Sequence, residues 1–482
     1  MRNLTLLTDL YELTMMQGYF KTGNNKTVIF DAFHRKNPCD GAYAISCGLD
    51  QVIDYIKNLH FSADDISYLE GLGIFDDDFL DYLRGFHFTG DIYAIPEGTV
   101  IFPREPIVKV IAPIMEAQLV ETAILNIINH QSLIATKAAR VCYAAKGDGI
   151  MEFGLRRAQG PDAGIYGARA AVIAGCVGTS NVLTGQMFDV PVKGTHAHSW
   201  IMSFPDEYTA FKTYADLYPR ACILLVDTYD TLRSGVPNAI RVFTEMREAG
   251  IDLKGYGIRL DSGDLAYLSK KARKMLDDAG FTDAIISASS DLDEYLIDSL
   301  KTQGAAITSW GVGTNLITAK DNPAFGGVYK LAAVMGDDGK FVPKIKLSEN
   351  SEKITNPGNK TVYRVYDTDG MIKADLIALT DEVYSETEPL LLFDPVETWK
   401  KTLLHPGEYT LREIMVPVFK NGECVYESPA VMDIQKYCKE EMATLWDESK
   451  RLVNPHKVHV DLSKKLYDVK QDLLNAYGSE KQ

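Results

Sequence analysis

The 482-residue sequence has few cysteines, and none of its seven forms a CxxC pair. A disulfide framework or a zinc-binding module needs closely spaced cysteines, so we expect neither, and a reducing cytosol fits this pattern best. The sequence also lacks a run of about 18 uncharged apolar residues, and its first 17 residues include Asp9 and Glu12 rather than a basic start and an apolar core. We therefore expect no transmembrane helix and no signal peptide.

Positive charge is also scarce, since 50 Lys and Arg face 66 Asp and Glu and the formal net charge is −16. Nucleic acids and anionic membranes are bound by basic surfaces, so neither is an expected partner. The net charge does not exclude a small anionic substrate, because a few Lys and Arg residues can form a local positive cleft in an acidic protein. The 46% apolar content is ordinary for a globular protein, and the length predicts two or three domains.

Helix and strand patterns alternate irregularly in the N-terminal quarter of the chain. Helical spacing starts near Leu10, and apolar residues recur with helical period over 116–140. Extended segments are predicted by their β-branched and aromatic content. These segments are residues 28–35, 42–48 and several short stretches within 91–113. Residues 1–125 are therefore expected to form an α+β domain.

The middle of the chain repeats one unit, an apolar run followed by small or polar residues and an amphipathic helix. The apolar runs lie within residues 221–231, 256–264, 284–293 and 306–316. Three of the following helices are predicted to end at Gly250, Gly280 and Gly304, because glycine favours the left-handed C-cap. Such repetition is typical of βαβ connections and a parallel sheet.

Earlier strands of the same sheet are predicted at 150–157, 176–181 and 190–200. This number of units indicates a barrel or part-barrel over residues 126–340, with functional side chains in the loops after its strands. Beyond 340 the alternation stops. Helices are predicted at 432–453 and at the C-terminus, within a region, 341–482, that is expected to pack back on the other two.

The segment GTHAHSW places His196 and His198 in a loop. Two histidines at i and i+2 could bind a metal, but zinc sites on helices use i and i+4, and no third ligand stands nearby. Histidine can also accept a phosphoryl group. A structural loop histidine remains the alternative.

Two acidic segments follow predicted strands. Asp227 and Asp230 lie in VDTYDT, where carboxylates suit Mg²⁺ or cap the next helix. RLDSGD groups Arg259 with Asp261, Ser262 and Asp264. An arginine here could grip a planar carboxylate, and Asp261 could bind a ribose diol or a metal. Alternatively the pair forms a salt bridge and Asp264 caps a helix.

Further candidates are an aromatic and basic loop, a glycine-rich turn, and Tyr11 on the N-terminal helix. In EFGLRRAQGPDAG, Phe153 could stack on a ring while Arg156 meets phosphate. In GVGTNL, the backbone at Gly313 and Thr314 could cradle a phosphate. A core phenylalanine, solvated arginines and a plain turn are the alternatives.

These segments resemble the successive signatures of nicotinate phosphoribosyltransferases. The matching segments are LLTDLYELTMMQGYF, EFGLRRAQGPDAG, GTHAHSW, LLVDTYDTL, IRLDSGDL, GVGTNL and NPHKVHVDLS. The resemblance implies a type II phosphoribosyltransferase fold, an irregular α/β barrel with an N-terminal sandwich-like domain and a C-terminal extension. It also implies a homodimer with shared active sites and the substrates nicotinate, phosphoribosyl pyrophosphate (PRPP) and ATP.

The resemblance further assigns roles to single residues. By motif position His198 is the phosphoryl acceptor, and Asp227 and Asp261 are catalytic acids on the Mg²⁺ and ribose side. Pyridine recognition is implied for Phe153 and Arg259, with Ser199 assisting and Tyr11 supplied by the second subunit. Contacts with PRPP and its phosphates are implied for Arg156, Ser289, Gly313 and Thr314.

The position equivalent to an amide-binding acid of nicotinamide-specific relatives is Ser180. A neutral side chain there favours a carboxylate substrate, because a second buried anion would repel it. A nicotinamide phosphoribosyltransferase and a non-catalytic barrel that binds NAD metabolites are the rival interpretations.

Overall fold

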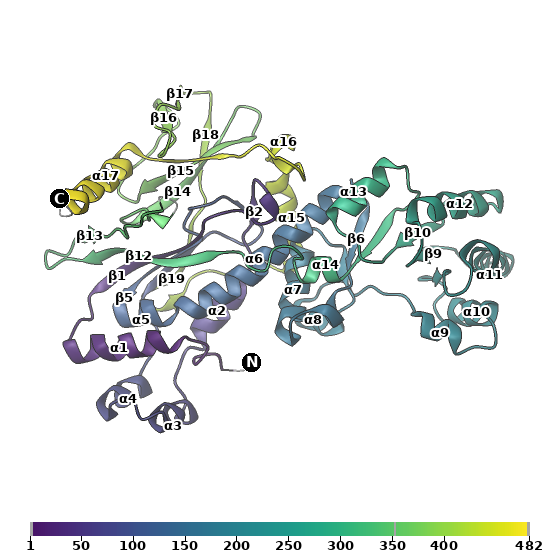
Figure 1. Ribbon diagram of the computed structural model, residues 1–482, viewed down its shortest axis with the longest axis horizontal. Coiled ribbons are helices and arrows are strands. Elements are labelled where there is room, and N and C mark those ends of the chain that lie inside the picture. The colour runs from purple at the N-terminus through teal and green to yellow at the C-terminus, as the bar shows by residue number, and fades with distance from the viewer. Residues whose placement is uncertain (1–2, 351–352, 480–482) are drawn as a thin grey trace. The chain divides into compact units, whose positions relative to one another are not determined.

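A computed structural model of the chain describes residues 3–350 and 353–479 (Figure 1). The chain forms two compact units. The first combines residues up to Leu133 with Ala324–Pro429 and the residues from Lys436 onward, and the second combines Ile134–Pro323 with Ala430–Gln435. None of the helices in the described ranges has the length and hydropathy needed to cross a bilayer.

The first unit is built on a seven-stranded sheet in the order β13-β12-β1-β5-β3-β19-β20. The strands are β1 (Thr27–His34), β3 (Asp91–Ala94), β5 (Val108–Pro113), β12 (Gly327–Met335), β13 (Phe341–Pro343), β19 (Val416–Lys420) and β20 (Glu423–Cys424). Strand β1 pairs antiparallel with both β5 and β12, so residues about 300 positions apart lie side by side. Six of its eight residues are buried and the other two, Thr27 and Phe33, are partly buried, as expected for a central strand.

The first unit also contains helices. They are α1 (Leu10–Thr22), α2 (Leu49–Lys57), α3 (Ala63–Gly71), α4 (Asp77–Arg84), α5 (Ile114–Leu119), the first half of α6 (Glu121–Ala144), most of α15 (Val431–Ala443), α16 (Asp447–Lys450) and α17 (Lys464–Ser479). Of these, α5 contacts β1 and β5 of this sheet. The predicted helix at 116–140 is confirmed by α5 and α6, and that at 432–453 is interrupted between α15 and α16. Leu13 and Met16 of α1 are buried, whereas Leu10 remains half-exposed.

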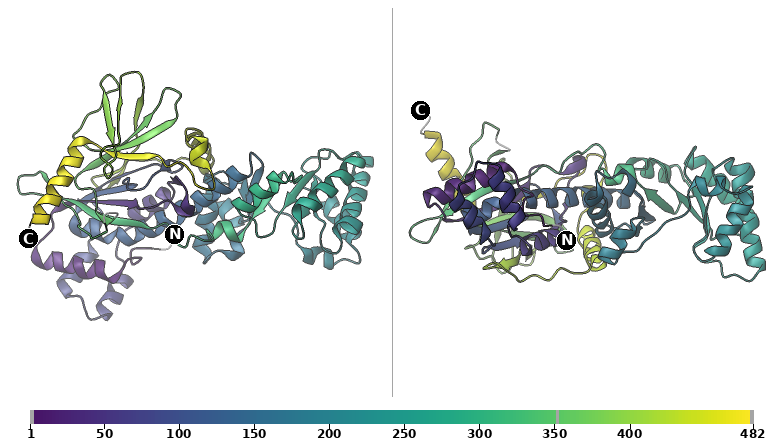
Figure 2. Two further views of the ribbon diagram at one scale, coloured as in Figure 1. Left: turned by 45° about the horizontal axis from the view of Figure 1, so that its top comes forward. Right: turned by 90° about the horizontal axis from the view of Figure 1, so that it is seen from below.

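A second sheet of the first unit has the order β18-β14-β15-β21. Its strands are β14 (Lys360–Tyr366), β15 (Ile372–Leu379), β18 (Thr410–Glu413) and β21 (His459–Leu462), and α17 packs against β15 (Figure 2). The short pairs β2 (Ala44–Ile45) with β4 (Val100–Ile101) and β16 (Leu390–Phe393) with β17 (Lys401–Leu404) complete the unit. The fully buried Arg364 pairs with Asp375 at 2.7 Å and Glu441 at 2.9 Å, which compensates its desolvation.

The second unit contains a parallel sheet in the order β7-β6-β11-β10-β9-β8. The strands are β6 (Gly149–Glu152), β7 (Gly178–Thr179), β8 (Ile223–Leu225), β9 (Gly257–Leu260), β10 (Ile285–Ala288) and β11 (Ser309–Val312). The helices are α7 (Pro161–Ile173), α8 (Val182–Phe188), α9 (His198–Met202), α10 (Glu207–Leu217), α11 (Val236–Glu248), α12 (Leu265–Asp278), α13 (Glu294–Thr302) and α14 (Thr314–Ile317). The predicted α/β class with a parallel sheet is confirmed.

The helices of the repeating βα units end where the sequence predicted. Gly250, Gly280 and Gly304 follow helices α11, α12 and α13 at φ angles of +73°, +82° and +71°, the left-handed region that favours glycine. Because β6, β9, β10 and β11 run parallel, their carboxyl ends lie at one edge of the sheet. Functional side chains in the following loops therefore meet at that edge.

The prediction of a strand over 190–200 is wrong. Only Val192 pairs there, in a single parallel bridge with Thr179, and the chain then turns through Gly194 into helix α9. Pro191 has no N–H to donate, which limits the ladder at this point. The consequence is a loop, Gly194–Ala197, that is free to fold over the ends of the neighbouring strands.

Candidate functional site

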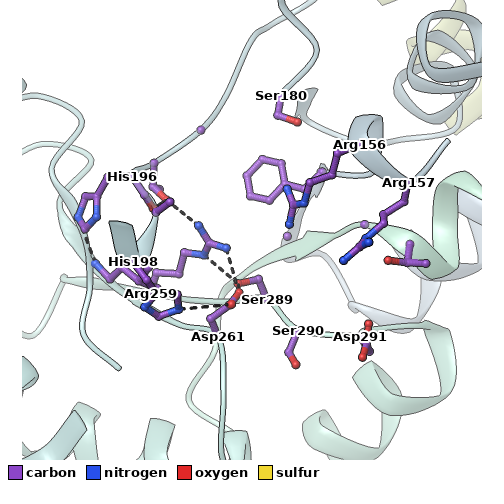
Figure 3. A pocket seen from close by; sticks show the side chains of 18 residues that line it. Arg156, Arg157, Ser180, His196, His198, Arg259, Asp261, Ser289, Ser290 and Asp291 are labelled. Carbon is purple, nitrogen blue, oxygen red and sulfur yellow. Dashed lines mark hydrogen bonds and ion pairs between the residues drawn. The ribbon is translucent and has the colours of Figure 1, made fainter. Parts of the chain in front are cut away.

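A cavity of about 510 Å³ opens at the carboxyl edge of the parallel sheet (Figure 3). It lies entirely within the second unit. Its lining comes from the ends of β8, β9 and β11, from the loops after β6, β7, β9, β10 and β11, and from the loop before α9 with the first residue of that helix. The lining residues are Phe153, Arg156, Arg157, Ser180, Gly194, Thr195, His196, Ala197, His198, Leu225, Arg259, Asp261, Ser289, Ser290, Asp291, Gly311, Gly313 and Thr314.

Arg259 is the centre of a hydrogen-bonded group on one wall (Figure 3). Its Nε donates to Ser289 Oγ at 2.8 Å, one terminal nitrogen donates to Thr195 Oγ1 at 2.9 Å, and the other donates to Asp261 Oδ1 at 2.9 Å. Ser289 also donates to Asp261. The guanidinium is thereby held at the cavity wall, with each of its three nitrogens donating to a side-chain oxygen that a ligand could replace.

Asp261 is held in its ionised form. Burial acts to raise its pKa, but the hydrogen bond from Ser289 and the charge of Arg259 outweigh burial, so the pKa lies below its ordinary value. The salt bridge considered as an alternative for Arg259 and Asp261 is therefore present, and it leaves the carboxylate facing the cavity.

The Phe153 ring forms an apolar face opposite these charges. Gly311 on the adjacent strand lets the ring approach closely, because a Cβ at that position would lie 2.5 Å from a ring carbon. The Arg259 guanidinium carbon lies 5.9 Å from the ring centroid. A flat ring stacked on Phe153 would therefore have a cation near its edge.

Glu152 supports the Phe153 loop from beneath. This fully buried carboxylate accepts hydrogen bonds from Thr179 Oγ1 at 2.6 Å and from the Gly154 N–H. Burial raises its pKa. The same carboxylate thus links the loop after β6 to the strand that leads to Ser180.

His198 lies at the N-terminus of α9 with its ring between a hydroxyl and two carboxylates. Its Nδ1 lies 3.0 Å from Thr228 Oγ1. Its Nε2 lies 3.7 Å from Asp261 Oδ2 and 3.9 Å from Asp227 Oδ1. The side chain is 39% exposed, so a ligand can reach it.

His196 has a different environment. It is 8% exposed, accepts a hydrogen bond from the Leu225 N–H at 3.3 Å and packs edge-on against Tyr214. Burial lowers its pKa to about 4, so it is neutral near pH 7. This arrangement supports a structural role for His196 and leaves His198 as the accessible imidazole of the pair.

Asp227 stands just behind the cavity lining. Its Oδ2 accepts hydrogen bonds from the Asp261 N–H at 2.9 Å and from Ser262 Oγ at 2.6 Å. Its Oδ1 is buried and has no hydrogen-bond partner in the described structure. An orphan carboxylate oxygen beside Asp261 is a suitable ligand for a hard cation.

No set of three or more His, Cys, Asp or Glu side chains is grouped as a metal site among residues 3–350 and 353–479. Two carboxylates are nevertheless enough for Mg²⁺ when phosphates and water complete its shell, which is how this ion is commonly held. Asp227 and Asp261 therefore fit a magnesium ion that arrives with a phosphorylated substrate.

Arg156 and Arg157 occupy the side of the cavity away from the histidines (Figure 3). Both are exposed, and Gly313 and Thr314 line the same cavity from the turn into α14. Exposed guanidinium groups beside the start of a helix suit a phosphate.

Three of the predicted site residues do not line the cavity. Asp227 lies behind Asp261, Ser199 is exposed on α9, and Tyr11 is 45% exposed on α1 in the first unit. Two other acids take the capping roles considered for them. Asp230 accepts from the N–H groups of Leu232 and Arg233, and Asp264 accepts from that of Tyr267.

Some lining residues were not predicted from the sequence. Thr195 lines the cavity and Thr228 contacts His198 from behind it; both lie inside the motifs GTHAHSW and VDTYDT, where only their neighbours were singled out. Ser290 has a φ angle of +108°, unusual for a residue with a Cβ, and nothing in its sequence context signals this.

The chain matches three family models that together cover most of its length. The nicotinate phosphoribosyltransferase (NAPRTase) N-terminal domain matches residues 6–129, the NAPRTase family matches 149–367, and the nicotinate phosphoribosyltransferase C-terminal domain matches 359–470. A nicotinate phosphoribosyltransferase of Bacillus subtilis is 48% identical over 479 residues, covering 99% of this chain and 96% of the relative.

A human nicotinate phosphoribosyltransferase is 31% identical over 519 residues, covering 96% of this chain and 95% of the relative. The crystal structure of human nicotinic acid phosphoribosyltransferase superimposes with a TM-score of 0.84 at 29% identity, covering 97% of this chain and 99% of that one.

Proposed function

Because the chain belongs to the nicotinate phosphoribosyltransferase family, we propose that it joins nicotinate to the ribose 5-phosphate unit of PRPP. The products are nicotinate mononucleotide and pyrophosphate. The observation that carries the proposal is the Phe153 ring face beside the guanidinium of Arg259 in a single cavity. An aromatic carboxylate fits both groups at once.

Nicotinate binds with its ring on Phe153 and its carboxylate on Arg259. The carboxylate replaces one or two of the oxygens that now accept from Arg259, so the guanidinium is not left unpaired. Ser180 lines the same cavity. An acid at this position would favour an amide, whereas the neutral serine does not repel the carboxylate of nicotinate. Stacking and the two-point grip fix the ring nitrogen in line with the reacting carbon.

PRPP occupies the rest of the cavity. Its phosphate groups lie against Arg156 and the turn at Gly313 and Thr314, and Asp261 accepts hydrogen bonds from the ribose hydroxyls. When bound, Mg²⁺ would be held by Asp227 and Asp261 and would neutralise charge that develops on the pyrophosphate. Ser289 keeps the Asp261 carboxylate oriented.

In the reaction the bond between the anomeric carbon and the pyrophosphate oxygen breaks, and pyrophosphate leaves with the electron pair. The pyridine nitrogen then supplies its lone pair to the same carbon. The anionic side chain of Asp261 stabilises the positive charge that builds up on the ribose. Phe153 and Arg259 limit the motion of the nucleophile and so reduce the entropy cost of its approach.

ATP enters as a co-substrate through His198. The imidazole attacks the γ-phosphorus, ADP leaves, and water later hydrolyses the phosphohistidine to release phosphate. The half-exposed ring, oriented by Thr228, supports this role. The phosphorylated ring lies beside Asp227 and Asp261, so its charge alters the affinity for PRPP and its products. This arrangement couples ATP hydrolysis to substrate binding and product release.

The assembly that we propose is a homodimer in the cytoplasm, in which Tyr11 of each chain completes the pyridine site of the other chain. The exposed ring of Tyr11 and the half-exposed Leu10 on α1 leave an apolar face available to a second copy.

A turnover assay with isotopically labelled nicotinate and nicotinamide, in parallel and with PRPP and ATP, tests the proposal. We expect labelled mononucleotide from nicotinate and roughly 5- to 150-fold less from nicotinamide, since an unpaired buried donor or acceptor costs about 1–3 kcal/mol. A preference for nicotinamide would favour the rival transferase. Binding of both pyridines without turnover would favour a non-catalytic barrel.

A further inference from the structure

A second, smaller cavity lies in the first unit, outside the catalytic unit. It is formed by β1, by the turn before β5 and by the segment that leads into β14. The polar groups that line it include Asp31, Arg104, Thr355, Asn356 and Lys360. The proposed catalytic function uses none of them.

Positive charge exceeds negative charge around this cavity. Lys360 is 2% exposed and pairs with Asp31 at 2.7 Å. Lys470 of α17 donates to the neutral Asn356 Oδ1 at 2.8 Å. Arg104 has no carboxylate partner within the described ranges of the chain. Three cations, of which Lys360 is buried and the other two are partly buried, therefore lie near the single carboxylate of the cavity lining, Asp31, although charges in buried positions are ordinarily balanced.

A second buried lysine, Lys109, lies near Lys360. Lys109 is 2% exposed and donates only to neutral oxygens, Asn359 Oδ1 at 2.9 Å and the Lys360 carbonyl at 2.8 Å. Burial and the nearby positive charges of Arg104 and Lys360 lower the pKa of Lys470 to about 8. The charges of Asp31 and Glu413 act on Lys109, whereas Lys470 lies near the cations Arg104 and Lys360 and has the neutral Asn356 as its hydrogen-bond partner among the described residues.

The backbone at the cavity rim is strained. Arg104 has a φ angle of +76°, in the left-handed region that side chains with a Cβ seldom adopt. Its N–H donates to the His34 carbonyl at 2.8 Å, which holds this conformation. Strain of this kind costs on the order of 1 kcal/mol and recurs where a side chain is positioned for a ligand.

We propose that this cavity binds a small inorganic anion of the size of chloride, which Arg104 and Lys360 of its lining hold in place, with the charge of Lys470 adjacent through Asn356. The space for the centre of a water-sized particle is about 10 Å³, enough for one such particle, and the cavity is partly open to solvent. The anion ties α17 to the segment before β14, so it stabilises the first unit independently of catalysis.

Thermal unfolding of the full chain in sodium chloride and in sodium gluconate at equal concentrations tests the proposal. Chloride fits the cavity and gluconate does not, so we expect a saturating rise in the unfolding midpoint with chloride alone. The Lys470→Met variant should lose this difference between the salts. The matched control is Lys464→Met on the same helix, at an exposed lysine paired with Asp468, and it should keep the difference.

Chloride binding is measured directly by the ³⁵Cl NMR line width. The wild type and Lys464→Met should broaden the line by an increment that is absent in Lys470→Met and in Arg104→Gln. Arg104 lies at the rim, so Arg104→Gln carries the test if Lys470→Met does not fold. Equal midpoints in the two salts, or a line width that survives both substitutions, would overturn the proposal.

Discussion

The Nδ1 atom of His198 lies 3.0 Å from the hydroxyl oxygen of Thr228. This hydrogen bond orients the imidazole, and the other ring nitrogen consequently faces Asp227 and Asp261 at 3.9 and 3.7 Å. The ring that we propose to be phosphorylated is therefore in contact distance of the groups that we propose to bind magnesium and ribose.

The first prediction follows from the contrast between the two histidines. His198→Ala should abolish acid-labile labelling by γ-³²P-ATP, whereas His196→Ala should retain labelling at a reduced level because the Leu225 N–H loses its acceptor. The measurement is the label bound per chain after rapid quenching. Label that persists in the His198 variant would remove this residue from the proposed ATP reaction.

A second prediction concerns the pyridine carboxylate. Arg259→Lys keeps the positive charge but loses the two parallel donors, which should cost about 1.5–3 kcal/mol of charged hydrogen bonding. The apparent KM for nicotinate should rise roughly 10- to 150-fold at saturating PRPP. An exposed arginine, Arg241→Lys, serves as the control and should behave as wild type. An unchanged KM in Arg259→Lys would leave Arg259 with a structural role only.

The third prediction tests shared active sites. Tyr11→Ala and His198→Ala should each be inactive, and a mixed dimer should contain one site with both defects and one intact site. Co-refolding the two variants should therefore restore up to about one quarter of the wild-type activity, because half of the dimers are mixed under random pairing and an isologous interface gives two sites. Mixed dimers that form but stay inactive would show that Tyr11 does not act on the neighbouring chain.

The fourth prediction concerns pH and stability. Burial raises the pKa of Glu12 to about 7, from an ordinary value near 4.5. Since the folded-state pKa is the higher one, this carboxyl stabilises the fold at low pH, and its contribution is lost as the pH rises through about 7. The loss should be on the order of 2 kcal/mol by pH 8.

Glu12→Gln removes that titration while its amide oxygen can still accept from Thr122, the partner of Glu12 Oε1. The stability of the variant relative to wild type should increase between pH 5 and pH 8. Thermal midpoints measured at both pH values check this outcome. A difference between variant and wild type that does not change with pH would contradict it.

Much of the site could be anticipated because it depends on local patterns. Arg259 and Asp261 end one strand and Ser289 follows its parallel neighbour, so the rule that such strands end at one edge brings them together. Gly250, Gly280 and Gly304 were also predicted from a local pattern, because glycine favours the left-handed conformation after a helix. Side-chain contacts that depend on packing, such as the Phe153 ring on Gly311, have no local signal.

The missed features share a physical cause, which is dependence on distant residues. The 190–200 segment has strand-like composition, but strand formation requires a paired neighbour and only Val192 finds one. Likewise, no feature of the two segments in the sequence predicts that β1 pairs with β12.

The discontinuity of the first unit has a consequence for protein synthesis. Val28 of β1 pairs with Val334 of β12, so the ribosome makes the partner strand only after Ile134–Pro323, the main segment of the second unit. At about 5–20 residues per second, β1 waits for roughly 15–60 s with one edge unpaired. The second unit can fold during that interval, whereas the nascent first unit presents an open sheet edge of the kind that chaperones cover or that aggregates through β-pairing.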